Sequence, residues 1–149
     1  MFTKVLTVCL ALAALAAVAG CTDRKENEAR LFLGRAELIS IDAPIAERRQ
    51  LLERLEALPL TDETVVAVRG KCVGGHGALI EAEEAQNEAT IALGSITGGD
   101  NAAHVPAADA ARIEAMITRS SEAIVRSRAL LVECEDGKQR LRRSIDGRS

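Results

Sequence analysis

The strongest constraint on the fold is a repeating pattern near the end of the chain. Apolar and small side chains, with one lysine among them, recur there at alternating intervals of four and three residues, at Ile113, Ile117, Ser120, Ile124, Ser127, Leu131, Cys134, Lys138, Leu141 and Ile145. Such an alternation keeps one stripe of side chains on a single face of an α-helix, where another helix packs. The pattern predicts a long helix with a packing seam, which ends or kinks at Gly137.

Two earlier segments also show helical periodicity. Leu31, Leu38, Ile45 and Leu52 recur every seven residues, but Pro44 interrupts the row and Asp42 before it is a good N-cap. This predicts a helix over 24–40, a kink or cap at 41–43 and a second segment over 43–58. Two adjacent heptad rows then predict a helix over 62–93; they consist of Val65, Cys72 and Leu79, and of Val66, Val73 and Ile80.

The remaining signals fix the fold class. Glycines, Asp, Asn and Pro in residues 94–106 predict a loop between the last two helices. Short β-branched runs such as TVVAV lie inside helical periodicity, so the strand signal is weak throughout. Helices joined by turns pack antiparallel to their neighbours. We therefore predict an all-α fold, an up-down-up three-helix antiparallel bundle with long helices and a kinked first helix.

The first 21 residues have the organisation of an export signal. Lys4 precedes an uncharged apolar run from Val5 to Val18, which is short for a membrane span. The segment that closes this run, Val18-Ala19-Gly20-Cys21, resembles the lipobox of bacterial lipoproteins, with an aliphatic residue, two small residues and a cysteine. The resemblance covers residues 1–21 alone. It implies cleavage before Cys21, a diacylglycerol thioether on its sulfur and acylation of its new amino group.

The resemblance implies a protein of the cell envelope that is anchored to a lipid bilayer through Cys21. Thr22 stands where an aspartate resembles an inner-membrane retention signal in enteric bacteria, so the outer membrane is favoured over the inner one. An uncleaved anchor helix is the alternative and also places the domain outside the cytoplasm. The predicted divisions are a signal peptide at 1–20, a lipid-anchored linker at 21–28, a bundle domain at 29–143 and a flexible basic tail at 144–149.

Cys72 and Cys134 are the two thiols that the mature chain keeps, since Cys9 leaves with the signal and Cys21 takes the lipid. Paired cysteines in an oxidising compartment most often form a disulfide. Counted from the 94–106 loop, the two cysteines are offset by about 9 Å along their helices, which a long loop can absorb. We predict a disulfide between Cys72 and Cys134, with free buried thiols or a metal site as alternatives.

The stretch KCVGGHG, residues 71–77, supports the metal alternative. Cys72 and His76 are four residues apart on one helical face, and Cys134 would be a third ligand if both cysteines were reduced. His104 cannot join them, because about 32 Å of helix lies between Cys72 and the predicted helix end. We predict no metal and no cofactor beyond the lipid, with Cys72, His76 and Cys134 as the alternative ligand set.

Four glycines in this region weaken the helix, each by up to about 1 kcal/mol relative to alanine. They are Gly70, Gly74, Gly75 and Gly77. Glycine at such positions either lets a neighbouring backbone approach closely or allows the helix to break. The sequence leaves both explanations open.

Composition and motifs argue against several functions. Phe2 and Phe32 are the only aromatic residues, so the chain lacks the faces on which nucleic-acid bases and sugars stack. No nucleophile elbow, HExxH sequence or dinucleotide fingerprint is present, and Gly70-Lys71 lacks the other residues of a phosphate loop. We predict a protein that is not an enzyme and does not bind nucleic acid.

Basic residues gather near the end of the chain, at Lys138, Arg140, Arg142 and Arg143. In an anchored up-down-up bundle this end projects from the membrane, where it can contact an envelope protein or an anionic cell-wall polymer. The alternatives are that the basic end lies along the acidic face of residues 81–88, or that it serves only to keep the chain soluble. We predict a structural or protein-interaction lipoprotein. The alternatives are a metal-binding or stress-sensing module that uses Cys72, His76 and Cys134, and an envelope chaperone or inhibitor with an exposed apolar groove.

Overall fold

A computed structural model describes residues 24–97 and 106–147, and within these ranges the chain forms helices and turns but no strand. The helices comprise residues 24–36, α2 (Ile45–Glu56), α3 (Glu63–Thr97) and α4 (Ala107–Asp146). The predicted all-α class is therefore confirmed. The lipobox-like segment with Cys21, the predicted signal peptide and His104 lie outside the described residues.

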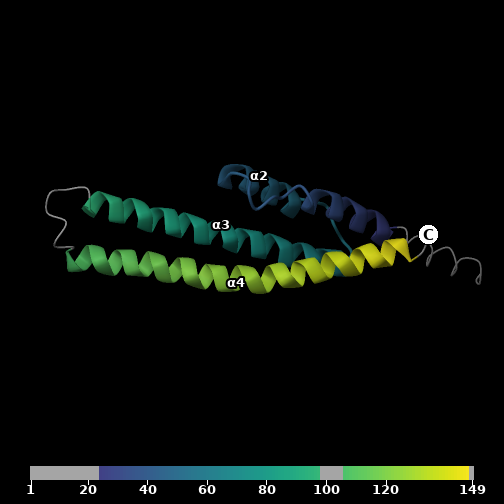
Figure 1. Ribbon diagram of the computed structural model, residues 1–149. Coiled ribbons are helices and arrows are strands. Elements are labelled where there is room, and N and C mark those ends of the chain that lie inside the picture. The colour runs from purple at the N-terminus through teal and green to yellow at the C-terminus, as the bar shows by residue number, and fades with distance from the viewer. Residues whose placement is uncertain (1–23, 98–105, 148–149) are drawn as a thin grey trace, which may run out of the picture.

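The two longest helices, α3 and α4, form an extended antiparallel hairpin (Figure 1). Their 35 and 40 residues correspond to lengths of about 52 and 60 Å at about 1.5 Å per residue. Near one end a disulfide joins Cys72 to Cys134, and further along the Glu88 carboxylate pairs with Arg119 at 2.7 Å. These pairs fix a single register along the whole hairpin.

The first helix and α2 cover only one half of the hairpin, which we call the base. The Glu28 carboxylate accepts the amide N–H of Asp62 at the start of α3, and residues 36–41 line a pocket together with His76. The first helix therefore runs in the same direction as α3. The α2 helix returns, because Arg48 near its start pairs with Glu83 and its last turn lies beside Arg69.

The described helices consequently alternate up, down, up and down, where a single kinked helix was expected to precede α3. The predicted kink at 41–43 is a complete turn over residues 37–44, and the first helix ends at residue 36. Pro44, at the N-cap position of α2, has no amide hydrogen to continue a helix through the turn. Leu38 and Ile41 are 54% and 58% exposed, so the turn leaves Leu38 of the expected apolar row, and Ile41 close to it in the sequence, in solvent.

The hydrophobic core lies in the base, where Phe32, Leu55, Val65 and Leu141 are almost fully buried. On α4 the predicted seam is confirmed at most positions, but Ile117 is 52% exposed. Two expected boundaries need correction. Gly137 neither ends nor interrupts α4, and the predicted tail from residue 144 is helical as far as Asp146 because Ile145 is buried in the core.

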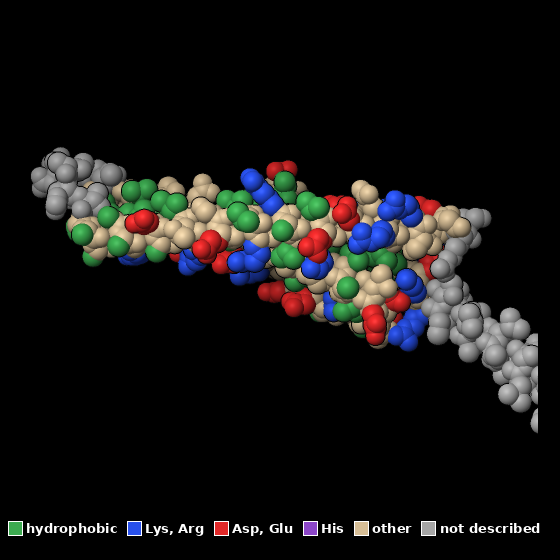
Figure 2. Space-filling view, turned by 90° about the horizontal axis from the view of Figure 1, so that it is seen from below, with side chains coloured by type: hydrophobic (Ala, Val, Ile, Leu, Met, Phe, Trp, Pro, Cys, Tyr) green, Lys and Arg blue, Asp and Glu red, His purple; other side chains and the backbone are tan. Residues whose placement is uncertain are grey.

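Beyond the base, two of the described helices continue, as residues 86–97 of α3 and 107–124 of α4, and we call this part the arm. Its interior contains mostly small residues, such as Ala89 and Ala123. Figure 2 shows hydrophobic side chains gathered near the tip of the arm on the face seen from below. None of the described helices is long and apolar enough to cross a membrane.

Candidate functional site

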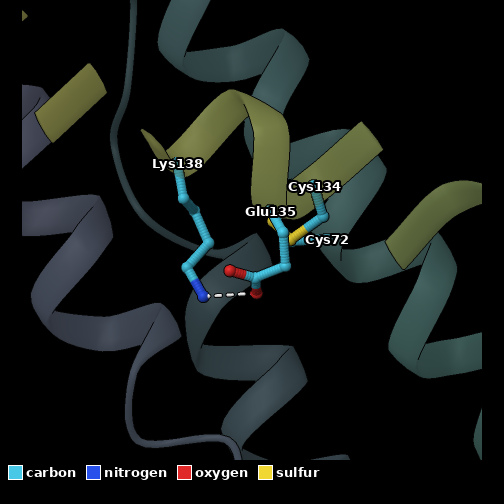
Figure 3. The surroundings of a disulfide bond; sticks show 4 residues. All are labelled: Cys72, Cys134, Glu135 and Lys138. Carbon is cyan, nitrogen blue, oxygen red and sulfur yellow. Dashed lines mark hydrogen bonds and ion pairs between the residues drawn. A yellow bond between two sulfur atoms is a disulfide. The ribbon is translucent and has the colours of Figure 1, made fainter. Parts of the chain in front are cut away.

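The predicted cysteine pair lies at the centre of the base. A disulfide joins Cys72 of α3 to Cys134 of α4, with Cα atoms 4.8 Å apart and both side chains 1% exposed (Figure 3). Counted from the described ends of the hairpin, Cys72 is 97 minus 72, or 25 residues, from Thr97, and Cys134 is 134 minus 107, or 27 residues, from Ala107. The expected offset nearly vanishes because α3 continues four residues past the predicted end at 93.

Small residues on both sides of the disulfide let the two helix backbones approach closely. A Cβ atom added at Gly75 would lie 2.9 Å from Leu131 Cγ, and one added at Gly137 would lie 2.7 Å from Val68 Cγ2. The helix α3 is continuous through this region, so close approach, and not a break, explains Gly75. Around Gly70 and Gly77 an added Cβ would meet nothing within 4 Å, so packing does not require glycine there.

Two serines of the α4 seam donate hydrogen bonds to buried backbone carbonyls of α3. The Ser127 hydroxyl donates to the carbonyl of Gly75 at 2.9 Å, and the Ser120 hydroxyl donates to that of Ala82 at 3.0 Å. Both serines are buried. Because buried hydroxyl groups need partners, these bonds explain how polar residues occupy a packing seam.

His76 lies four residues after Cys72 on α3. The disulfide occupies both sulfurs of the alternative ligand set, and no group of three potential metal ligands occurs in residues 24–97 and 106–147. The Nδ1 atom of His76 is buried without a hydrogen-bond partner. Burial, together with the nearby Lys138 ammonium, lowers the pKa of His76 below its ordinary value of 6.5, although Glu135 opposes this.

The lowered pKa of His76 makes stability depend on pH. As the pH falls below 6.5, the unfolded chain takes up a proton before the folded chain does, so we expect the free energy of unfolding to fall through this window. Urea titrations at a series of pH values measure the slope. A His76→Leu variant should lose it, while His104→Gln, at the only other histidine, should keep it; equal slopes in both variants would refute this assignment.

The basic residues expected to face a partner have different surroundings. Lys138 is 9% exposed and pairs with Glu135 at 2.7 Å (Figure 3), and Arg142 pairs with Glu37 of the first helix at 2.7 Å. Arg140 and Arg143 are exposed. Two of the four predicted contact residues therefore have partners within the chain, and the partners are not the acidic residues 81–88.

The position of this basic end also differs from the expectation. The up-down-up topology would have put it far from residue 24, but the additional turn at 37–44 reverses the chain once more. Ile145 of α4 belongs to the same core cluster as Ala29 and Leu60, near the start of α3. The basic end of α4 therefore lies at the base, beside the beginning of the described chain.

Two arginines that the sequence reasoning missed join α2 to α3. Arg48 is 3% exposed and binds Glu83 through its two terminal guanidinium nitrogens, and Arg49 pairs with Glu84. A buried arginine of this kind is stable only when a carboxylate neutralises it. Its place in the sequence could have identified Arg48 as buried. Arg48 continues the four-three spacing of Ile41, Ile45, Leu52 and Leu55, so it lies on the apolar face of α2.

Glu28 joins the first helix to the start of α3. Its carboxylate accepts N–H groups of Thr61 at 2.8 Å and Asp62 at 2.7 Å, and the Thr61 hydroxyl at 2.6 Å. The Asp62 side chain in turn caps α3 by accepting the amides of Thr64 and Val65. These donors, with the Asp62 amide foremost, lower the pKa of Glu28 from 4.5 to about 2.

This carboxylate predicts a second effect of pH. Because the folded pKa is depressed, its contribution to stability is complete above pH 4.5 and disappears as the pH falls toward about 2. Glu28→Gln should therefore be less stable than the wild type at neutral pH and should lose less stability on acidification. Glu26→Gln is the matched control, since Glu26 forms only an exposed pair with Arg30 on the same helix. Thermal unfolding at pH 7 and pH 3 distinguishes the two variants; identical behaviour would contradict the capping role.

The arm carries a groove on each side of the hairpin. One is bordered by charged residues, among them Glu88, Asp109 and Arg112. The other, which we call the neutral groove, has a volume of about 370 Å³ and is lined by Gln86, Ala89, Thr90, Leu93, Ile117, Ser120, Ser121 and Ile124. No charged residue lines the neutral groove. An uncharged, partly apolar surface of this kind is typical of protein contact sites.

Comparisons with known proteins return no relative. No protein-family model matches the chain, and no curated protein or solved structure is significantly similar to it.

Proposed function

We propose that the protein is a lipoprotein of the cell envelope that serves as a structural or protein-interaction module and catalyses no reaction. Its anchor is the lipid on Cys21, in the outer rather than the inner membrane, and the arm is the part that contacts a partner. The observation that carries this proposal is where the described chain starts relative to the arm. It starts at the base, three residues after Cys21, and the arm points away from this start (Figure 1).

The contacts within the base are suited to holding the arm in a fixed orientation. The Glu28 cap fixes the first helix to the start of α3, and the Cys72–Cys134 disulfide joins α3 to α4. A disulfide fits a protein outside the cytoplasm, because reducing conditions inside the cell keep thiols free. An anchored protein that projects a rigid helical pair away from a membrane is suited to contacting a partner at a distance.

The basic end of α4 has a different role in this proposal from the one that the sequence predicted. Because it lies at the base, exposed Arg140 and Arg143 face the anchored side, where anionic lipid headgroups attract basic residues. Contact with a distant cell-wall polymer through these residues is therefore disfavoured. Among the alternatives, the metal-binding module requires both cysteines reduced, whereas a chaperone or inhibitor requires the kind of apolar groove that the arm carries.

Metabolic labelling with an alkyne-bearing fatty acid tests the anchor. The wild-type chain should incorporate label and sediment with membranes, whereas Cys21→Ser should do neither. Cys9→Ser is the matched control, because it changes a cysteine of the signal that is expected to be removed. An unlabelled wild type, or a labelled Cys21→Ser variant, would refute the proposed anchorage.

A further inference from the structure

The neutral groove continues an interface that already exists within the molecule. Ile117, Ile124, Leu131 and Lys138 recur every seven residues, so they lie on one face of α4. At Leu131 and Lys138 this face borders Ala36, the last residue of the first helix, and the turn that follows it. One and two heptads further along, at Ile124 and Ile117, the same face lines the neutral groove. The first helix thus packs along the hairpin in the base and ends before it reaches the arm.

Exposed apolar side chains mark the place where the first helix stops covering the hairpin. Ile117 is 52% exposed in the neutral groove, although it belongs to the four-three seam. Leu38 and Ile41 are exposed at the turn where the chain leaves the hairpin. Exposed apolar side chains thus occur both in the neutral groove and at the turn that follows the first helix.

We propose that the neutral groove binds the neutral groove of a second copy of this chain, with the two arms antiparallel. In a two-fold contact the same patch lies on both subunits, so charged patches of one sign would repel each other and neutral ones do not. The opposite groove is less suited, since burying Glu88, Asp109 and Arg112 would remove charges from water. Two arms of two helices each form a four-helix bundle, in which each tip points toward the exposed turn of the other copy.

The inference rests on the proposed function, in which the arm is the contact surface, and it names the occupant of that surface. Disulfide crosslinking in intact cells that express two differently tagged copies of the full chain tests it. Ser121→Cys places a thiol in the neutral groove, near the expected two-fold axis. Ile91→Cys is the control, because Ile91 is 73% exposed on the same arm and lines the opposite groove.

We expect Ser121→Cys to give a reducible crosslink between the two tags, and Ile91→Cys to give little. Adding Ile117→Glu to Ser121→Cys should lower the yield at least about tenfold, because a glutamate would be buried without a partner. Thermal unfolding of this variant verifies that it folds, as the exposure of Ile117 leads us to expect.

Equal crosslinking at Ser121 and Ile91, or none at Ser121, would overturn the inference. So would a crosslink from Ser121→Cys to a different protein, although that result would leave the proposed function standing. Failure of the proposed function has a separate signature, the absence of fatty-acid label on Cys21, which does not depend on whether two copies meet.

Discussion

Replacing Cys72 with serine should lower the free energy of unfolding by about 4 kcal/mol. The disulfide closes a loop across a sequence separation of 62 residues, and in the chain-entropy model a loop of that length restricts the unfolded chain by about this amount. Both sulfurs are buried in the base, where α3 and α4 meet the first helix. Urea unfolding followed by circular dichroism measures the loss as a shift of the midpoint.

Two comparisons separate the crosslink from other effects of the substitution. Cys134→Ser should lose the same amount of stability, and a reducing agent should bring the wild type down to the level of the variants without changing the variants themselves. A wild-type midpoint that does not respond to complete reduction would contradict a stabilising disulfide.

Gly75→Ala should destabilise the protein by about 2 kcal/mol, although alanine favours a helix over glycine by about 1 kcal/mol. The new Cβ atom would lie 2.9 Å from both Cγ and Cδ2 of Leu131 and 3.1 Å from its backbone nitrogen. The side chain can rotate, but the backbone nitrogen moves only if α4 moves. Such a movement would also strain the neighbouring hydrogen bond from Ser127 to the Gly75 carbonyl.

Gly70→Ala is the matched control one and a half turns away on the same helix. Gly70 is exposed, and a Cβ there would meet nothing within 4 Å. This variant should gain up to about 1 kcal/mol from helix propensity alone. Opposite signs for the two substitutions support close packing at Gly75, whereas stabilisation by both would show that the helices have room to separate there.

The four-three pattern predicted the α4 seam because a repeating helical face is encoded locally. The same pattern could not identify where the helices of the base stop covering this face of α4. Ile117 fits the seam as well as Ile113 does, yet Ile117 is exposed because no helix from the base extends along the arm. The length of the first helix, and not the pattern of α4, decides how much of that face is buried.

The ends of helices were harder to predict than their existence. The Gly94-containing end of α3 was expected to be a loop, but α3 continues to Thr97. A single glycine costs a helix only about 1 kcal/mol, which adjoining turns can offset. The turn at 37–44 was expected as a kink, because a proline preceded by a capping residue fits either structure. Only the tertiary contacts of α2 with α3 distinguish them.

The surroundings of the charged residues in the base were the hardest to predict, because they depend on tertiary structure. Lys138 was predicted as a contact for an external partner, but it is buried beside the disulfide and paired with Glu135. Arg48 was not recognised, although it interrupts an apolar row. In both cases the sequence shows a charge on a packing face, while the partner that makes its burial tolerable depends on how the chain folds.

Peptide mass spectrometry of the chain purified from membranes, without reduction, tests the anchored and disulfide-linked hairpin most directly. We predict an N-terminal peptide that begins at Cys21 and carries a diacylglycerol group, together with a disulfide-linked pair of peptides containing Cys72 and Cys134. An N-terminus that retains residues 1–20 with Cys21 unmodified, or free thiols at Cys72 and Cys134, would contradict the account.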